Sequence, residues 1–144
     1  MDSNTIGRQA QEDFERVLIG KGKSIWYWRI PDTTDIRRRQ KGNSYASLPR
    51  GPADFIVCDF DGVHLAEVKG TTNHDKFYLD HIEALQQGAC DRIFNLCGDS
   101  YFFYLKSFYT NRWFKITPGY ILQAIAKRQK AIYFKDLEKF SWVN

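Results

Sequence analysis

The sequence predicts one α/β domain in which a central sheet is flanked by helices. The chain has 144 residues, enough for a single domain, and 43% of them are hydrophobic, enough for a packed core. Segments with apolar residues at helical spacing alternate with short β-branched and aromatic runs. Their order is helix, strand, strand pair, helix, strands and helix, which is typical of a mixed α/β domain over residues 1–144.

The first third of the chain predicts a helix, a strand and a long loop. Apolar residues recur at helical spacing over 7–19, and Gly20 ends this helix. The aromatic run 24–30 predicts a strand. The segment that follows is long, polar and basic, so we expect a flexible basic loop at about 31–51, and loops of this length in a compact domain are usually functional or mobile.

A β-hairpin is the clearest local prediction. The apolar runs 54–60 and 63–69 flank Asp61 and Gly62, a pair that is typical of a tight turn. The elements expected after it are a polar loop over 70–76, a helix over 78–88, strands over 92–97 and 101–105 joined by a turn over 98–100, a strand over 112–116, a helix that Thr117 and Pro118 open and that runs to about Gln129, and a short strand over 131–134.

Composition excludes several classes of protein. The three cysteines, Cys58, Cys90 and Cys97, form no C-x-x-C pair, so they indicate neither a disulfide framework nor a cysteine zinc site. No apolar stretch is long enough to span a membrane, and residues 1–11 lack the apolar core of a signal peptide, so we expect an intracellular, cytoplasmic protein. The net charge of +4 and a pI near 9.0 are compatible with a nucleic acid partner.

Basic residues are concentrated in and beside the expected loop. Between residues 29 and 50 there are six basic residues and only two aspartates. The basic residues are Arg29, Arg37, Arg38, Arg39, Lys41 and Arg50. The pattern fits a solvated charged loop, and it fits equally a loop that contacts phosphates without reading sequence.

The hairpin is predicted to bring two acidic residues and a lysine together. Glu67 and Lys69 lie two apart in one strand, so both side chains point to the same face, whereas His64 points to the other. The turn places the start of the first strand beside the end of the second, and therefore Asp54 near Glu67. Two carboxylates repel one another unless a cation neutralises them, and their oxygens suit Mg²⁺, for which Mn²⁺ can substitute.

Such a site has a defined chemical use. A divalent ion polarises a phosphodiester and lowers the pKa of a bound water, and the backbone carbonyl of Val68 would be a further ligand. Lys69 would orient or help to deprotonate that water, or stabilise charge on the phosphate. The alternative is an ordinary Glu67–Lys69 pair on a half-exposed strand; Asp54 at a hairpin's length upstream favours the metal site.

These residues carry a resemblance to a family of nucleases. Residues 52–54 (Pro-Ala-Asp) and 67–69 (Glu-Val-Lys) resemble the PD-(D/E)xK motif of restriction-endonuclease-like nucleases. The pattern over 7–97 is similar to RecU-type Holliday junction resolvases and related phage proteins, and less closely to archaeal resolvases. The resemblance implies a restriction-endonuclease-like αβββαβ core, Mg²⁺-dependent cleavage of four-way DNA junctions by a homodimer, and a prokaryotic or viral origin.

The resemblance also implies a metal contact from the first helix. The family usually has a glutamate there, and the matching position in this chain is Gln11, which has an oxygen but no charge. Glu12 and Glu15 are nearby alternatives, and Glu15 lies nearer to the apolar stripe of the helix than Glu12 does. The choice among these three residues stays open at this point.

Further DNA contacts are suggested outside the metal site. The family often has a glutamine at the start of its second helix, where His81 falls. This histidine would contact phosphate or a metal-bound water, or be an ordinary helix-surface residue. His74 lies beside Lys76 in the polar loop, where a solvated position is favoured over a phosphate contact. The aromatic runs 26–28 and 101–104 are expected in the core and at a dimer surface.

Three functions are therefore compatible with the sequence. The leading hypothesis is an endonuclease specific for branched DNA. A restriction-like or mismatch nuclease acting on duplex DNA is the second, although the chain has no separate recognition domain. A DNA-binding module without catalysis is the third, and Gln11 is the feature that favours it.

Overall fold

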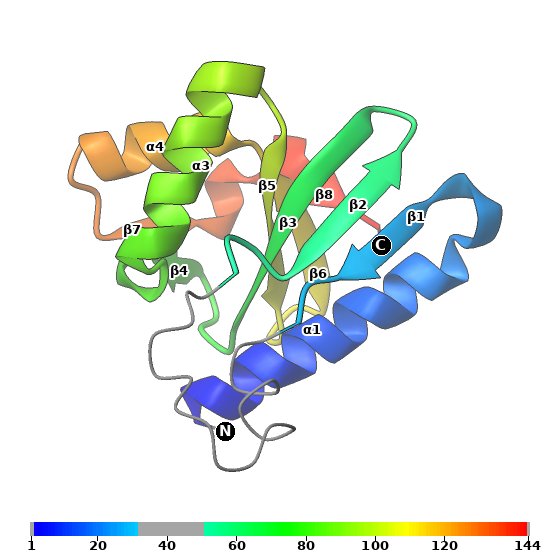
Figure 1. Cartoon of the computed structure of the whole chain (residues 1–144). Coiled ribbons are helices and arrows are strands. Elements are labelled where there is room, and N and C mark those ends of the chain that lie inside the picture. The colour runs from blue at the N-terminus through cyan, green and yellow to red at the C-terminus, as the bar shows by residue number, and fades with distance from the viewer. Residues whose placement is uncertain (1, 32–50, 144) are drawn as a thin grey trace, which may run out of the picture.

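The computed structural model describes residues 2–31 and 51–143, and Figure 1 shows its mixed α/β architecture. Five of the candidate DNA contacts lie outside the described residues: Arg37, Arg38, Arg39, Lys41 and Arg50. The helices and strands of the described part are α1 (Ser3–Gly20), β1 (Trp26–Arg29), β2 (Phe55–Asp59), β3 (Gly62–Thr71), β4 (Lys76–Tyr78), α3 (Ala84–Cys97), β5 (Tyr101–Ser107), β6 (Arg112–Ile116), α4 (Pro118–Ala126), β7 (Ala131–Tyr133) and β8 (Ser141–Trp142). Short 3₁₀ turns lie between them: η1 (Gly22–Ser24), η2 (Leu79–His81), η3 (Phe134–Asp136) and η4 (Glu138–Phe140).

The main sheet has six strands in the order β1-β2-β3-β5-β6-β8. Strands β3 and β5 run parallel, and all other neighbours in this sheet are antiparallel. A parallel pair needs a crossover connection, which α3 provides between β3 and β5. Strands β4 and β7 form a separate antiparallel pair.

Helix α1 covers one face of the sheet, and α3 with α4 covers the other (Figure 1). Ala10, Phe14 and Leu18 recur every four residues on α1, and all three are buried. The ring of Phe14 packs against Phe55, with 5.1 Å between the centroids, and against Tyr104, with 4.6 Å. Complete burial of a side chain such as Phe14 contributes roughly 1.5–3 kcal/mol, so this cluster fixes α1 on the sheet.

Most predicted elements are confirmed. The structure has the first helix, the hairpin, the strands at 101–105 and 112–116, the helix that Pro118 begins and the short strand near 131–134, with boundaries shifted by a few residues. Gly62, at the hairpin turn, has a φ of 116°, a value that side chains with a Cβ rarely adopt. The short strand near 131–134 pairs with β4 and not with the main sheet, so the two strands form a ribbon of their own.

Two predictions around residues 78–97 are wrong. The second helix begins at Ala84, not at Tyr78, because Lys76–Tyr78 pairs with β7 and η2 follows. The run 92–97 is the end of that helix and not a strand, since a short apolar run has no period of its own that separates the two states. Gly98, with a φ of 74°, ends the helix; its N–H donates to the carbonyl oxygen of Phe94 over 2.9 Å.

The helices and the aromatic runs of the described residues have two further properties. None of their helices has both the length and the apolar character needed to cross a membrane. Of the aromatic runs, Tyr101, Phe103 and Tyr104 are buried in the core, whereas Trp26 and Trp28 on the edge strand β1 are more than half exposed.

Candidate functional site

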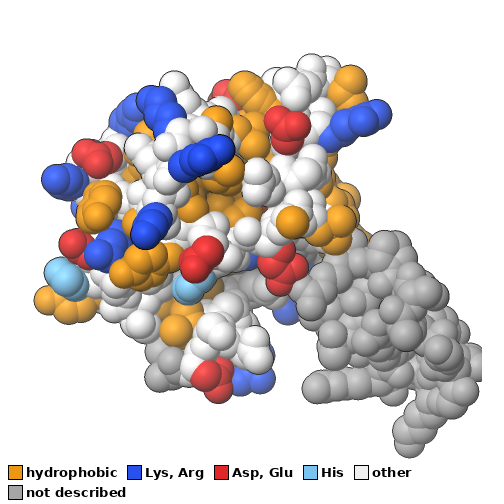
Figure 2. Space-filling view, turned by 90° about the vertical axis from the view of Figure 1, so that its left-hand side faces the viewer, with side chains coloured by type: hydrophobic (Ala, Val, Ile, Leu, Met, Phe, Trp, Pro, Cys, Tyr) orange, Lys and Arg blue, Asp and Glu red, His pale blue; other side chains and the backbone are white. Residues whose placement is uncertain are grey.

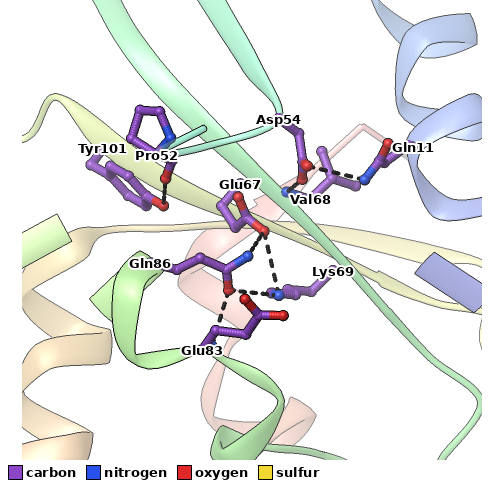
Figure 3. A network of polar contacts seen from close by, with 9 residues as sticks. All are labelled: Gln11, Pro52, Asp54, Glu67, Val68, Lys69, Glu83, Gln86 and Tyr101. Atoms are coloured by element: carbon purple, nitrogen blue, oxygen red, sulfur yellow. Dashed lines mark hydrogen bonds and ion pairs between the residues drawn. The ribbon is translucent and has the colours of Figure 1, made fainter. Parts of the chain in front are cut away.

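The hairpin brings Asp54, Glu67 and Lys69 together, as its register requires (Figure 3). Phe55 is the partner of Ala66, and the N–H of Asp54 donates to the carbonyl oxygen of Ala66 over 3.1 Å, so Asp54 lies beside Glu67. Glu67 and Lys69 point to the same face of β3, and their Oε1 and Nζ atoms are 3.3 Å apart. The three side chains predicted to share a site therefore do so.

Asp54 is held by β3 and by α1. Its Oδ2 accepts a hydrogen bond of 2.8 Å from the N–H of Val68, and its Oδ1 accepts one of 3.0 Å from Nε2 of Gln11. The amide oxygen of Gln11 in turn accepts a hydrogen bond of 3.1 Å from Arg29. Tyr101 fixes the approach to this position, because its hydroxyl donates to the carbonyl oxygen of Pro52 over 2.6 Å.

Of the three candidates on the first helix, Gln11 is the one that contacts Asp54. Glu15 lies one helical turn further on, where it accepts a hydrogen bond of 3.3 Å from the hydroxyl of Tyr27 and lies 3.8 Å from Arg29. Glu12 is exposed on α1. The helix therefore presents an uncharged amide to the two carboxylates, with Glu15 engaged by β1.

The sequence reasoning missed Gln86, which joins the two charged residues of β3. Its Nε2 donates to Oε1 of Glu67 over 2.6 Å, and its Oε1 accepts a hydrogen bond of 2.9 Å from Nζ of Lys69 (Figure 3). Gln86 reaches this position because it occupies the first turn of α3, where its Oε1 also accepts from the N–H of Glu83 over 3.1 Å. Glu83 and Gln86 form a capping box at the start of α3. The usual signature of this box has Ser, Thr, Asp or Asn at the first position, so glutamate there gave only a weak signal in the sequence.

His81 was expected at the start of the second helix, and that position is wrong, because the helix begins at Ala84 and Gln86 lies in its first turn. A contact between His81 and DNA stays a prediction. His81 lies on η2 before the helix, half exposed, with its ring against those of Phe77 and Tyr78 at centroid distances of 5.7 and 6.4 Å. The displacement follows from placing the helix start at Tyr78 instead of Ala84.

The other predicted DNA contacts among the described residues are dispersed. Arg29 borders the site through its hydrogen bond to Gln11. His74 is exposed beside Asp75, and its ring lies 6.0 Å from that of Tyr109. Lys76 belongs to β4 and lies near the rings of Tyr78 and Tyr133. None of these three contacts the Glu67–Gln86–Lys69 network through a bond in the described structure.

Burial governs the charges of the two carboxylates. Glu67 is 3% exposed, and burial together with the neighbouring Asp54 raises the pKa of its carboxyl group, although Lys69 opposes this shift. Burial also raises the pKa of Asp54, against the N–H of Val68 and the charge of Lys69. A buried carboxylate beside a second, half-buried one does not ionise readily unless cations neutralise the pair.

The donor set fits a hard divalent ion. Asp54 and Glu67 supply carboxylate oxygens, and the carbonyl of Val68 points to the side of Asp54, because the N–H and C=O of one strand residue lie on the same side. His64 points away to the α1 face, as predicted, and its Nε2 lies 2.7 Å from the hydroxyl of Tyr104. Residues 2–31 and 51–143 contain no group of three or more His, Cys, Asp or Glu side chains that could hold a metal, so backbone or amide oxygens would complete the ligand set.

Comparison with known proteins gives no family assignment. No protein-family profile matches the sequence, and no curated protein matches it significantly. The site itself consists of two neighbouring carboxylates, one ammonium group and one bridging amide at the open end of a β-hairpin.

Proposed function

We propose that this protein is a metal-dependent endodeoxyribonuclease that cleaves branched DNA, with four-way junctions as the preferred substrate. One observation carries the proposal: the half-buried Asp54 lies beside the buried Glu67, the two carboxylates repel one another, and Lys69 is 3.3 Å from Glu67. The order α1, β1, β2, β3, α3, β5 supports it, because this is the helix–three strands–helix–strand order of the restriction-endonuclease-like core to which the motif belongs.

The chemistry assigned to the residues follows from their contacts. Mg²⁺ supplies Lewis acidity and lowers the pKa of a water molecule when it is bound. Asp54, Glu67 and the carbonyl of Val68 are the residues that would hold it. Lys69 is directed toward Glu67 by the amide of Gln86, so its ammonium lies where it can orient a water or stabilise charge on a phosphate.

The proposed DNA contacts are basic and independent of sequence. Arg29 stands next to the site, and the segment that contains Arg37, Arg38 and Arg39 follows directly after β1. Lys and Arg contacts to phosphates set position without reading base edges, so the preference for branched DNA would come from its shape and flexibility.

A homodimer is part of the proposal, because paired nicks in a junction require two sites related by symmetry. Trp26 and Trp28 are 57% and 59% exposed, and they lie on the same face of β1 at the edge of the sheet. This apolar edge is the surface that we assign to the second copy. Replacing Trp28 with glutamate is expected to give a monomer in sedimentation analysis, and a dimer of unchanged affinity would remove this assignment.

The proposed activity is tested on three DNA substrates of the same sequence: a four-way junction, a linear duplex and a single strand. Each is incubated with Mg²⁺, Mn²⁺ or EDTA. Symmetric nicks in the junction alone, with either metal but not with EDTA, are the expected result. Asp54→Asn, Glu67→Gln and Lys69→Ala should abolish the nicks and leave junction binding intact, whereas Asp61→Asn at the exposed turn of the same hairpin should cut like the wild type.

Two other outcomes correspond to the alternatives. Cleavage of the duplex at the rate of the junction would indicate a restriction-like or mismatch nuclease. Junction binding without cleavage in any metal would indicate a DNA-binding module. The amide of Gln11 favours this alternative, because it bonds an oxygen of Asp54 without adding charge. The variant Gln11→Glu then separates an inert module from a nuclease that lacks one ligand, since restored cleavage would show that only this ligand was missing.

A further inference from the structure

Strands β4 and β7 form a two-stranded ribbon with one buried and one exposed face. Phe77 and Ile132 are partners across the ribbon, and they are 3% and 2% exposed. Side chains alternate along a strand, so the residues on either side of this pair share the outer face. These are Lys76 opposite Tyr133, and Tyr78 opposite Ala131.

The outer face places a cation between two open aromatic rings. Tyr78 and Tyr133 are 41% and 40% exposed. The Nζ atom of Lys76 lies 5.4 Å from the ring of Tyr78 and 5.7 Å from that of Tyr133, and Lys135 lies 5.8 Å from the latter ring. The core requires none of these side chains, because the ribbon is anchored by its opposite face.

The face is also hollowed. A cavity of about 380 Å³ lies between the ribbon, the first turn of α4 and the segment that joins α4 to β7; its lining includes Tyr78, Tyr120, Lys130, Ala131 and Tyr133. Ala131, which has a small side chain, is the partner of Tyr78 across the ribbon and also lines the cavity. The volume lies at the lower end of the range for sites that bind small molecules, which suits a single nucleotide.

The surroundings of the cavity are basic. Residues 127–139 contain five Lys or Arg residues, while Asp136, which also lines the cavity, and Glu138 are the acidic ones; Glu138 is paired with Arg112 over 2.7 Å. Figure 2 shows this side of the molecule, with Lys and Arg side chains interspersed among hydrophobic ones, a group that includes tyrosine in that colouring. Basic residues interleaved with exposed aromatic rings are the arrangement that binds single-stranded nucleic acid.

We propose that this tyrosine ribbon binds an unpaired nucleotide of single-stranded DNA, such as a branch point exposes. A base stacks on the ring of Tyr78 or Tyr133, and Lys76 and Lys130 contact the adjoining phosphates. The choice of DNA rests on the proposed function, whereas stacking and phosphate binding rest on the ribbon alone. The chain runs from β4 through η2 into the first turn of α3, so the bound strand lies beside the element that carries Gln86.

The test is binding of a fluorescein-labelled oligothymidine, measured by anisotropy in EDTA at several salt concentrations. Cleavage plays no part in this measurement, so it succeeds or fails independently of the nuclease assay. The double variant Tyr78→Ala/Tyr133→Ala is expected to bind at least fivefold more weakly, since stacking on an aromatic ring is removed. Tyr78→Phe/Tyr133→Phe, which keeps both rings, should bind like the wild type.

Lysine variants supply the second readout. Lys76→Gln/Lys130→Gln should weaken binding and reduce the slope of log affinity against log salt by about 0.7 for each phosphate that is no longer neutralised. These substitutions leave the buried face of the ribbon unchanged, so they test the proposal even if the alanine variant does not fold. Tyr109→Ala, which removes a tyrosine that is 69% exposed in another turn, is the matched control and should have no effect.

Three results would overturn the proposal. One is wild-type affinity in both the alanine and the lysine double variants. Another is an equal fall in affinity in Tyr109→Ala, which would show that any exposed tyrosine contributes. The third is that Tyr78→Ala/Tyr133→Ala loses as much affinity for a fully paired duplex of the same length as for the single strand. This result would show that the surface binds phosphates without stacking on bases.

Discussion

Over residues 66–70 the two faces of β3 carry opposite kinds of side chain, although they belong to one strand. Toward α1 the strand presents His64, Ala66, Val68 and Gly70, and α1 covers them with apolar residues such as Phe14. Toward α3 it presents Leu65, which packs on the apolar core there, and then the charged Glu67 and Lys69, which the amide of Gln86 in the first turn of the helix bonds. Glu67 is thus buried where a helix begins, with its carboxylate hydrogen-bonded by the side chain of Gln86.

The largest effect is expected from neutralising the charged face. Glu67→Gln should reduce cleavage about a thousandfold or more, since several kcal/mol of metal-dependent stabilisation is removed. The same change should stabilise the metal-free protein at alkaline pH. The fold raises the pKa of Glu67, so the wild type loses stability as the pH rises toward and through this raised pKa. Glutamine does not ionise, so the variant does not suffer this loss. Denaturant unfolding in EDTA at pH 6 and 9 measures this gain; a less stable variant at pH 9 would contradict it.

The apolar face should instead respond to acid. Burial lowers the pKa of His64 to about 4, with Lys115 adding to the shift and Asp59 and Asp61 opposing it; the hydroxyl of Tyr104 is its hydrogen-bonding partner. The unfolded chain takes up this proton near pH 6.5, so stability falls as the pH drops from about 6.5 to 4, by roughly 3 kcal/mol at most. His64→Gln should flatten the fall. Unfolding curves of the two proteins at pH 7 and 4.5 give the difference, and parallel decreases would contradict the prediction.

Close packing of α1 on β3 gives the next effect. A Cβ on Gly70 would lie 2.9 Å from a ring carbon of Phe108, 3.0 Å from Cβ of Ala10 and 3.1 Å from Cγ2 of Ile6. Gly70→Ala should therefore cost about 1–3 kcal/mol of stability. Gly88→Ala on α3, where nothing lies within 4 Å of the new carbon, is the control and should gain about 0.4–1 kcal/mol. Thermal unfolding compares them; equal effects at both positions would show that helix packing is not the cause.

Among the effects on cleavage, the smaller one is expected from the residue that joins the two charged side chains. Gln86→Ala leaves Glu67 and Lys69 in place but removes both hydrogen bonds, so cleavage should fall by about 10- to 100-fold, the usual cost of removing a partner of a metal ligand. The pH at which the cleavage rate rises should move as well, because Gln86 bonds both titrating side chains. A residue with a purely structural role would leave the pH profile of the rate unchanged. Gln87→Ala, one position along the same helix, is the matched control, and equal decreases in both variants would argue against a positioning role for Gln86.

Local rules were sufficient for much of this protein. The alternation of a strand predicted that Glu67 and Lys69 share a face and that His64 does not, and the Asp61-Gly62 turn predicted that Asp54 lies beside Glu67. The first helix, the hairpin and the later strands followed from periodicity. These features depend on residues that are close in sequence, so their geometry needs no knowledge of the rest of the chain.

The tertiary structure decided what distant segments contribute. Residues 76–78 became a strand because β7, more than fifty residues later, pairs with them, and this moved the start of α3 to Ala84. That start brought Gln86, and not His81, to Glu67 and Lys69, while α1 brought Gln11, and not Glu12 or Glu15, to Asp54. Pairing and packing between segments far apart in the chain select such partners, and short-range patterns in the sequence do not encode them.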